Sequence, residues 1–179
     1  MLIVEGPDGA GKTQLIQRLR LNLQLELMPR VVSSDTEMMV DLQEWVNEDL
    51  HAGLKRAIYD RHRLISEPIY GPVLRKEMQP GFADLRWLRN RQQTLRRIQP
   101  YVIFCLPPLE VVRENVFKDD SNWVVQEHIN TIYWLYFNAA AAWTGSTAVW
   151  DYTTSSYTAL QIGVTNWMMS RGIYDHRRK

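Results

Sequence analysis

Eight residues near the N-terminus have the types and spacing that bind the phosphates of a nucleoside triphosphate. An apolar run over residues 2–5 leads into Gly6-Pro7-Asp8-Gly9-Ala10-Gly11-Lys12-Thr13, which follows the pattern G-x-x-x-x-G-K-T, and a helix-forming stretch comes next. The three glycines permit positive φ, so the backbone N–H groups can approach an anion closely. The N-terminus of the following helix adds a favourable dipole. The sequence therefore predicts a triphosphate-binding loop between a strand and a helix.

Two side chains of this loop have a predicted chemical role. Lys12 is expected to reach the β- and γ-phosphates, and the Thr13 hydroxyl is expected to ligate Mg²⁺. The predicted ATP-binding residues are Gly6, Pro7, Asp8, Gly9, Ala10, Gly11, Lys12, Thr13 and Gln14. A glycine-rich turn with a chance lysine is the alternative, and the order of strand, loop and helix favours the triphosphate site.

A second pattern places an acid and an arginine together after a predicted strand, in Tyr59-Asp60-Arg61-His62. In a phosphoryl-transfer site the Asp60 carboxylate can order Mg²⁺ and its waters, or accept the proton of the attacking oxygen. The Arg61 guanidinium can bind phosphate oxygens with two parallel hydrogen bonds. A surface salt bridge at a strand end is the alternative, but the nearby triphosphate loop favours a functional pair.

The elements that must position these residues alternate along the chain, which predicts an α/β fold with a parallel sheet of about five strands and crossover helices. The carboxyl ends of such strands are where open α/β sheets bind ligands. The predicted strands are 1–5, 30–34, 55–59, 100–106 and 146–150. The predicted helices are 12–27, 36–52, 83–98, 108–118, 123–143 and 156–171, with a short helix and a loop over 64–82.

The composition is that of a soluble single domain of 179 residues. A net charge of +1, from 21 basic and 20 acidic residues, gives no electrostatic case for a nucleic-acid or membrane partner. The lone Cys105 excludes an intrachain disulfide and lies in an apolar run, where a buried core role is expected. With no signal peptide pattern and no apolar tract long enough to span a bilayer, we expect a cytoplasmic protein.

These motifs resemble those of a known family. Residues 5–13 closely resemble the E-G-x-D-G-A-G-K-[ST] opening of thymidylate kinases. Asp60-Arg61-His62, followed by Ser66-Glu67-Pro68-Ile69-Tyr70-Gly71, resembles the D-R-[YH] motif of that family and its downstream S-x-x-x-Y-x-G. Deoxynucleoside kinases share the fold and carry a comparable acid–arginine pair. The resemblance implies one three-layer P-loop kinase domain over 1–179, with a short lid at about 113–128.

The same resemblance implies a reaction and roles for residues. It implies transfer of the γ-phosphate of ATP, with Mg²⁺, to a deoxynucleoside monophosphate, in the first place dTMP or a related, possibly modified, pyrimidine nucleotide. By this likeness Asp8 contacts the sugar of the acceptor, and Arg61 clamps the acceptor phosphate or the transferred one. Tyr70 and Arg75 are implied to lie near the acceptor, although Tyr70 is equally suited to packing. The catalytic set is then Lys12, Asp60, Arg61 and Asp8, and the metal ligands are Thr13 and Asp60.

The chain departs from the family pattern at three places. After the second predicted strand the family has R-E-P-G-G, whereas this chain has Ser33-Ser34-Asp35-Thr36-Glu37, in which Asp35 either contacts substrate or caps a helix. The segment between Lys12 and Asp60 is also short, which leaves the acceptor base open. The lid is poor in cations, with Arg113 as the expected ATP contact. Arg89 and Arg96, from the arginine-rich helix 83–98, are the candidates to compensate, against the alternative of a solvated helix face.

Two further assignments and the partners stay open at this point. Thr153 is implied to contact adenine after the last strand, or else forms a turn before the last helix. The aromatic helix 123–143 is expected to be mostly core, with part of it a possible homodimer surface. Nucleotides are the expected partners. The alternative functions are a deoxynucleoside kinase, a kinase of a hydroxyl on a modified nucleotide or DNA base, and a nucleotide-binding module that hydrolyses slowly.

Overall fold

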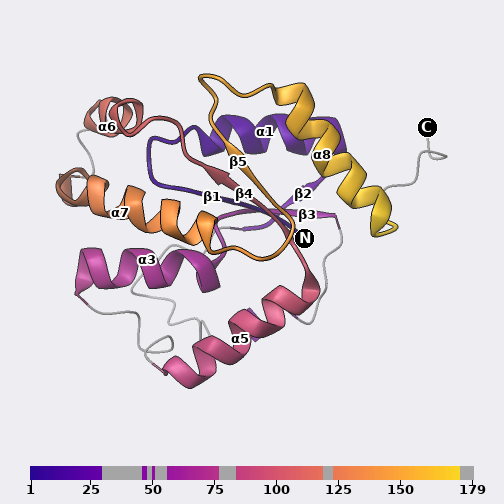
Figure 1. The fold of residues 1–179 in the computed structure, drawn as a ribbon, viewed down its shortest axis with the longest axis horizontal. Helices are drawn as coiled ribbons and strands as arrows, with labels where there is room; N and C mark the ends of the chain where they lie inside the picture. Colours follow the sequence, from indigo (N-terminus) through magenta and orange to yellow (C-terminus); the bar gives the residue numbers. More distant parts are fainter. Residues whose placement is uncertain (30–45, 48–49, 51–55, 77–83, 119–122, 174–179) are drawn as a thin grey trace.

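The protein is described here by a computed structural model, in residues 1–29, 46–47, 50, 56–76, 84–118 and 123–173. Five parallel strands form one sheet in the order β2-β3-β1-β4-β5, flanked by helices on both faces (Figure 1). This is the α/β fold that the sequence predicts. The strands are β1 (Leu2–Glu5), β2 (Glu26–Leu27), β3 (Ala57–Asp60), β4 (Tyr101–Cys105) and β5 (Thr147–Trp150).

The described helices form a layer on each side of the sheet. They are α1 (Lys12–Leu23), α3 (Arg63–Arg75), α5 (Leu85–Ile98), α6 (Leu109–Phe117), α7 (Trp123–Ala141) and α8 (Tyr157–Ser170). Helices α1 and α8 lie together on one face, and α3, α5 and α7 on the other (Figure 1). Alternate residues of β4 reach the two layers, because Tyr101 packs on Trp167 of α8 while Phe104 packs on Trp143 after α7.

The register of the sheet brings the ends of four strands to one edge. Val4 lies opposite Asp60, Glu5 opposite Phe104, and Cys105 opposite Trp150. The central strands β1 and β4 are buried along their whole length, as their continuous apolar runs predict. The residues that follow β1, β3 and β5 are therefore held near one another by a rigid core.

The predicted first helix ends earlier than expected. Helix α1 stops at Leu23, where Gln24 adopts a left-handed conformation (φ 52°) and its N–H bonds to the Arg20 carbonyl. Residues 26–27, predicted as the end of this helix, instead form β2 and pair with β3. The spacing of the apolar residues in this stretch suits a helix, but the pairing of residues 26–27 with β3 outweighs their local helix propensity. The predicted strand 30–34 lies outside the described residues, as does most of the predicted helix 36–52, of which residues 46, 47 and 50 are helical.

Helix α3 is longer than the short helix predicted for 64–82, although it contains two prolines. It starts at Arg63 and runs for 13 residues with Pro68 and Pro72 inside. A proline has no N–H to donate to the carbonyl four residues earlier. The carbonyl that Pro68 leaves without its helical donor is that of Leu64, and the Gln92 side chain of α5 donates to it at 2.9 Å. A contact between helices thus replaces the lost helical bond.

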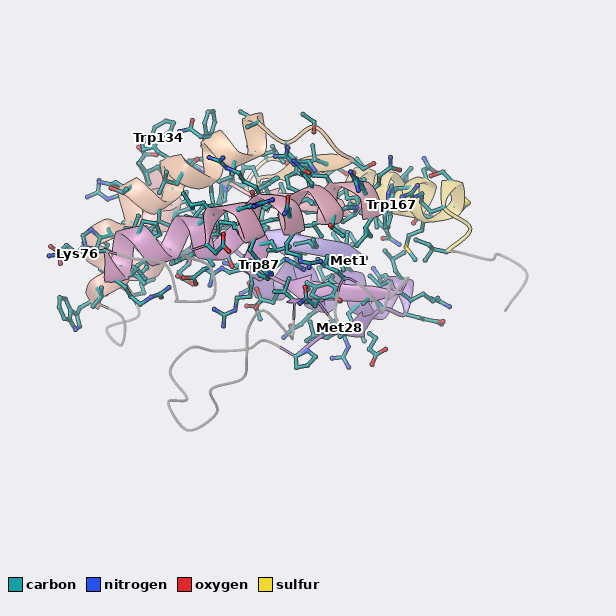
Figure 2. All side chains as sticks on the ribbon, turned by 90° about the horizontal axis from the view of Figure 1, so that it is seen from below. Met1, Met28, Lys76, Trp87, Trp134 and Trp167 are labelled. Atoms are coloured by element: carbon teal, nitrogen blue, oxygen red, sulfur yellow. The ribbon has the colours of Figure 1, made fainter. Side chains whose placement is uncertain are left out.

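Helix α7 buries only part of its aromatic side chains, which corrects the expectation that it is mostly core. Tyr133 and Tyr136 are buried, whereas Trp123, Trp134 and Phe137 are 68%, 52% and 47% exposed. Figure 2 shows Trp134 projecting from α7 away from the sheet.

Cys105 is buried, as predicted, and burial raises the pKa of its thiol to about 12. In the described part of the chain, no helix combines the length and the apolar character that crossing a membrane requires.

Candidate active site

The loop between β1 and α1 has the backbone that its glycines predict. Gly6, Gly9 and Gly11 have φ values of 139°, 75° and 77°. A Cβ atom on Gly9 would lie 2.8 Å from the carbonyl oxygen of Val112 in α6. On Gly11 it would lie 2.8 Å from the ring of Tyr152. The loop is therefore packed between α6 and the segment that follows β5, and a side chain at either glycine would clash.

This loop forms one wall of a cavity of about 630 Å³. The predicted residues Asp8 to Gln14 line it, together with Asp60 from the end of β3. Other lining residues were not predicted from the sequence and come from α1, α6 and the β5–α8 region: Leu15, Arg18, Asn115, Trp150, Tyr152 and Tyr157. The predicted loop thus faces an open space large enough for a nucleotide.

Asn115 connects the loop to Tyr152, in the segment that follows β5. Its side-chain amide donates to the Gly9 carbonyl at 2.9 Å and to the Tyr152 hydroxyl at 2.8 Å. One feature of the sequence points toward this role of Asn115. It belongs to the helix predicted over 108–118, and that helix directly follows the end of a predicted strand. The expected lid cation on the same helix, Arg113, is exposed and does not line the cavity.

Aromatic residues and an arginine also line the cavity. The Arg18 guanidinium lies 3.7 Å from the centre of the Tyr157 ring. Asn22 of α1 also donates to the Tyr157 hydroxyl at 2.9 Å, so two residues of α1 hold this ring of α8. Tyr152 adds a second ring beside Gly11. Flat, polarisable groups of this kind can stack on a nucleobase.

Lys12 is folded back onto its own loop. Its side chain is almost completely buried, and its ammonium donates to the Pro7 carbonyl at 2.6 Å. Burial and then the positive charge of Arg61 lower the pKa of Lys12 to about 8, against the opposing charges of Asp8 and Asp60. The ammonium is thus poorly solvated, and an approaching anion would restore the stabilisation that it lacks.

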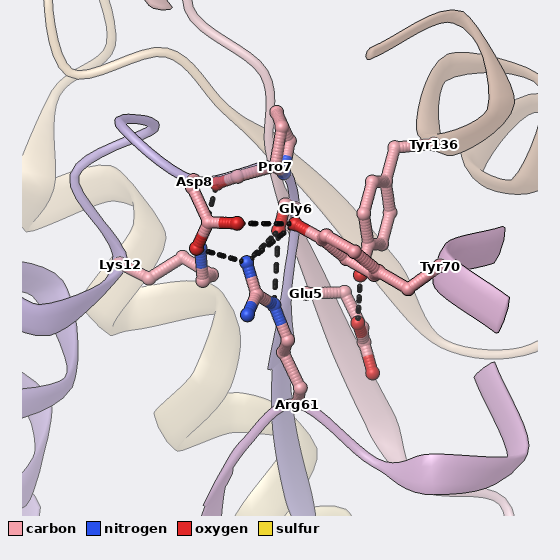
Figure 3. A network of polar contacts seen from close by, with 8 residues as sticks. All are labelled: Glu5, Gly6, Pro7, Asp8, Lys12, Arg61, Tyr70 and Tyr136. Atoms are coloured by element: carbon pink, nitrogen blue, oxygen red, sulfur yellow. Dashed lines mark hydrogen bonds and ion pairs between the residues drawn. The ribbon is translucent and has the colours of Figure 1, made fainter. Parts of the chain in front are cut away.

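Arg61 reaches the loop from the end of β3 (Figure 3). It adopts a left-handed conformation (φ 66°), which is uncommon for a residue with a side chain. Its Nε and Nη2 groups each donate to the Gly6 carbonyl at 3.3 Å, and Nη2 also bonds Asp8 Oδ1 at 2.7 Å and the Tyr70 hydroxyl at 2.6 Å. Within the described part of the chain, Nη1 makes no hydrogen bond to protein.

Asp8 and Tyr70 complete this network. The Tyr70 hydroxyl donates to Asp8 Oδ2 at 2.9 Å, and its ring packs edge-on against Tyr136 with centroids 6.0 Å apart. Burial would raise the pKa of Asp8, but the charges of Arg61 and Lys12 outweigh it and lower this pKa to about 2. The ring of Tyr70 packs, as one interpretation of the sequence expected, and its hydroxyl bonds Arg61 and Asp8, two of the residues predicted to contact the acceptor.

Glu5 lies directly beneath the loop and was not given a role from the sequence. It is fully buried, and its Oε1 accepts a hydrogen bond from the His62 backbone N–H at 2.7 Å. Its Oε2 accepts from the Tyr136 hydroxyl of α7 at 3.1 Å. Burial raises the pKa of Glu5 to about 7, although these two hydrogen bonds and the charge of Arg61 favour the ionised form. A charged residue inside an apolar strand is the sequence signal that marks it.

Other predicted residues lie away from this cluster. Arg75 is paired with the buried carboxylate of Glu67 within α3. Thr153 donates from its backbone N–H and its hydroxyl to Asp151 Oδ1, at 2.9 and 2.6 Å, and it does not line the cavity. This geometry agrees with the turn that was the alternative for Thr153.

The two arginines proposed to compensate for the thin lid do not line the loop cavity. Arg89 is exposed on α5. Arg96 lies 6.0 Å from the Trp143 ring and lines a separate apolar cavity of about 190 Å³ between α3, α5 and α7. The arrangement agrees with the solvated helix face that was the alternative for these residues. Asp35 lies outside the described residues.

Searches by sequence find no matching family model and no matching curated protein. Comparison with solved structures nevertheless shows that the fold is a known one. A YorR protein from Bacillus subtilis, in complex with phosphorylated GDP, superposes with a TM-score of 0.70 at 17% identity, over 98% of this chain and 99% of that one. Deoxyadenosine kinase from M. mycoides with bound dATP gives a TM-score of 0.61 at 14% identity, over 93% and 98%. The same enzyme with dCTP gives 0.57 at 18%, over 95% and 100%.

Proposed function

We propose that this protein is an ATP- and Mg²⁺-dependent kinase that phosphorylates a nucleotide or nucleoside, with a deoxynucleoside monophosphate such as dTMP as the leading acceptor. One observation carries the proposal. Lys12 and Arg61 come from separate strand ends, repel each other, and have Asp8 and Asp60 as the nearby acids. Because a phosphoryl group between the two cations would relieve this repulsion, the site suits phosphoryl transfer.

The donor would occupy the cavity of about 630 Å³ beside the loop. On binding, Lys12 would exchange the Pro7 carbonyl for phosphate oxygens, while the N–H groups of the loop surround the β-phosphate. The aromatic part of the cavity, formed by Tyr152 and the Arg18–Tyr157 pair, suits the base of the donor. The γ-phosphate would then lie near Lys12 and Asp60, which also line the cavity.

Thr13 and Asp60 fit the Mg²⁺ that this reaction needs. Both line the cavity beside Lys12, and they supply one hydroxyl and one carboxylate. Mg²⁺ typically takes one or two protein oxygens and completes its octahedron with phosphate oxygens and waters. When bound, the ion would neutralise charge on the β- and γ-phosphates. Asp60 would either order this ion or accept the proton of the acceptor.

The acceptor would bind on the Arg61 side of the loop. Nη2 and Nε of Arg61 are held by Asp8, Tyr70 and the Gly6 carbonyl, so the direction of the guanidinium is fixed before a ligand arrives. Nη1 remains to donate to a phosphate oxygen of the acceptor. Asp8, whose carboxylate is ionised at neutral pH, would accept from a sugar hydroxyl.

A nucleoside is the second candidate acceptor, and one observation favours it. Asp8 neutralises much of the charge of Arg61 through a 2.7 Å ion pair, which weakens the attraction for a phosphate on the acceptor. A neutral nucleoside would need only the hydrogen bonds of Asp8, Arg61 and Tyr70. The likeness in fold to deoxyadenosine kinase is consistent with this option.

The test is a product assay with a panel of acceptors. The protein is incubated with ATP, Mg²⁺ and each of the deoxynucleosides and deoxynucleoside monophosphates, and the products are separated by anion exchange. Formation of dTDP from dTMP, with one ADP for each dTDP, is the expected result. Monophosphates formed from nucleosides would support the second candidate. Loss of ATP that is independent of every acceptor would overturn both and leave a slowly hydrolysing nucleotide-binding protein.

A further inference from the structure

Glu5 has no direct access to the substrate cavity, yet it contacts the turn that carries Arg61. We propose that Glu5 is a positioning residue for Arg61, which acts by holding the His62 backbone against the end of β1. The proposal deepens the proposed function, because it rests on the role of Arg61 in binding the acceptor. It concerns the accuracy with which the guanidinium is aimed, and Glu5 itself does not touch the reacting atoms.

The turn at Arg61 is held by two bonds to β1. The Arg61 N–H donates to the Val4 carbonyl at 2.9 Å, which continues the β1–β3 ladder by one residue. The next N–H, that of His62, donates to Glu5 Oε1 at 2.7 Å. Between these bonds Arg61 takes its left-handed conformation (φ 66°), and α3 begins directly afterwards. The carboxylate therefore fixes the backbone on the side of Arg61 that leads into α3.

Glu5 also connects this turn to helix α7, which lies in the same layer as α3. Its second oxygen accepts from the Tyr136 hydroxyl of α7 at 3.1 Å, and the Tyr136 ring packs on Tyr70, which bonds Arg61. The guanidinium is thus supported through its backbone by Glu5 and through its side chain by Tyr70. Both supports meet at Tyr136 (Figure 3).

The carboxylate is the form of Glu5 that fits this role, because an ionised acceptor makes the stronger hydrogen bond. The titratable groups that face it are Arg61 at the end of β3, Lys12 of α1, Tyr70 of α3, Cys105 of β4 and Tyr136 of α7. Since burial raises the pKa of Glu5 to about 7, its ionisation changes within the physiological range. Arg61 is then expected to be well aimed above this pH and less well aimed below it.

A merely structural Glu5 would fill space beneath the loop and leave no trace in the pH dependence. The Glu5→Gln variant separates the two roles, since it keeps the size and an oxygen acceptor but has no carboxylate to titrate. Tyr136→Phe is the matched variant, because it removes only the hydroxyl that favours the ionised form of Glu5. It should move the midpoint of the Glu5 titration to higher pH.

The first measurement is kcat/KM for the acceptor between pH 5.5 and 8.5. In the wild type it should fall about tenfold from pH 8 to pH 6, with a midpoint near 7, while KM for ATP changes less than twofold. Glu5→Gln should be reduced at pH 8 and lack this step, and Tyr136→Phe should shift it upward. The acceptor phosphate ionises in the same way with all three proteins. Its effect therefore cancels when their pH profiles of kcat/KM are divided by one another. An unchanged step in Glu5→Gln would overturn the proposal.

The second measurement needs no turnover. The Arg61 Nε–H resonance in ¹H–¹⁵N spectra, assigned by its loss in Arg61→Lys, should move with a midpoint near pH 7 in the wild type and not move in Glu5→Gln. If this titration is seen and no acceptor is phosphorylated, the proposed function fails while the positioning of Arg61 by Glu5 stands. If phosphate transfer is seen and the resonance titrates equally in both proteins, the positioning role fails. Should Glu5→Gln not fold, an unshifted midpoint in Tyr136→Phe would be the contradicting result.

Discussion

The two halves of the candidate site differ in how they are built. The proposed donor half is an open cavity along a contiguous loop, and the ammonium of its main cation, Lys12, donates to a carbonyl of that loop. The acceptor half is a closed network in which Asp8, Arg61 and Tyr70 satisfy one another before any ligand is present. The donor half therefore has to reorganise around a triphosphate, whereas the acceptor half is already organised.

This difference has a consequence for substitutions. A change in the donor half should remove charge from the moving phosphoryl group and lower kcat. A change in the acceptor half should disturb an aimed guanidinium and raise the acceptor KM. For a residue that belongs to one half alone, the KM of the substrate of the other half serves as an internal control.

The largest effect is expected for Lys12→Ala. Removing the ammonium that is proposed to contact the β- and γ-phosphates should lower kcat by about 10³-fold or more. The fold should persist, because Lys12 is a buried cation whose removal ends an unfavourable desolvation. Circular dichroism and steady-state turnover measure both. The exposed Arg97→Ala on α5 serves as the control and should match the wild type; undiminished turnover in Lys12→Ala would refute the donor site.

Asp60→Asn should reduce kcat by about 10²–10³-fold, because the amide can neither accept a proton nor order Mg²⁺ as a carboxylate does. Asp60 belongs to both halves, so KM for ATP and KM for the acceptor should change by less than kcat. Replacing Mg²⁺ by Mn²⁺ separates the two roles of Asp60. Partial rescue would indicate the metal role, and wild-type rates in the variant would exclude Asp60 from the mechanism.

Arg61→Lys tests the acceptor half alone. Lysine keeps the charge but lacks the planar fork that bonds the Gly6 carbonyl, Asp8 and Tyr70 together. The acceptor KM should rise about 10–100-fold, whereas KM for ATP should stay within twofold. Initial rates with both substrates varied give the two constants, and an equal rise in both would show that the halves are not separate.

Tyr152→Ala is the corresponding test of the donor half. Its ring lies against Gly11 and its hydroxyl accepts from Asn115, so its loss should raise KM for ATP about 5–10-fold and leave the acceptor KM unchanged. Tyr152→Phe keeps the ring and loses only the hydroxyl, and it should show an effect of about twofold. A larger effect in Tyr152→Phe than in Tyr152→Ala would contradict the stacking role.

The smallest effect concerns stability and its pH dependence. The folded-state pKa of Glu5 is about 7, above its ordinary value of 4.5, so the folded protein holds this proton more tightly than the unfolded chain. This tighter proton binding stabilises the folded protein fully below pH 4.5. The stabilisation is lost as the pH rises to about 7, which lowers the free energy of unfolding by about 2–3 kcal/mol. Glu5→Gln should lack this loss and be the more stable protein at pH 8. Urea unfolding at pH 5 and 8 measures it, and an identical pH dependence in both proteins would contradict the shifted pKa.

The sequence specifies the donor half better than the acceptor half, and the reason is physical. Gly6, Gly9 and Gly11 constrain the backbone locally, so a single stretch of sequence predicts the loop conformation that the structure shows. Asn115 and Tyr152 join this loop through tertiary packing, which no local spacing encodes. These two residues were therefore missed.

The geometry of the acceptor half is set by the register of the sheet and by the burial of its side chains. Asp60 and Arg61 were found because they end a predicted strand. Glu5 and Tyr136 form a contact 131 residues apart, which no local pattern predicts. The strand at residues 26–27 shows the same limit, because its pairing with β3 overrides a helical pattern. The parallel sheet was predictable from alternation alone, and the identity of its edge strand was not.

The most direct test of the two-half site is a calorimetric titration with a non-hydrolysable ATP analogue, Mg²⁺ and the acceptor that gives product. The account predicts that each ligand binds one site per chain in the presence of the other. It also predicts that Arg61→Lys weakens acceptor binding at least tenfold while the analogue binds as in the wild type. Mutually exclusive binding of the two ligands, or equal weakening of both by Arg61→Lys, would contradict it.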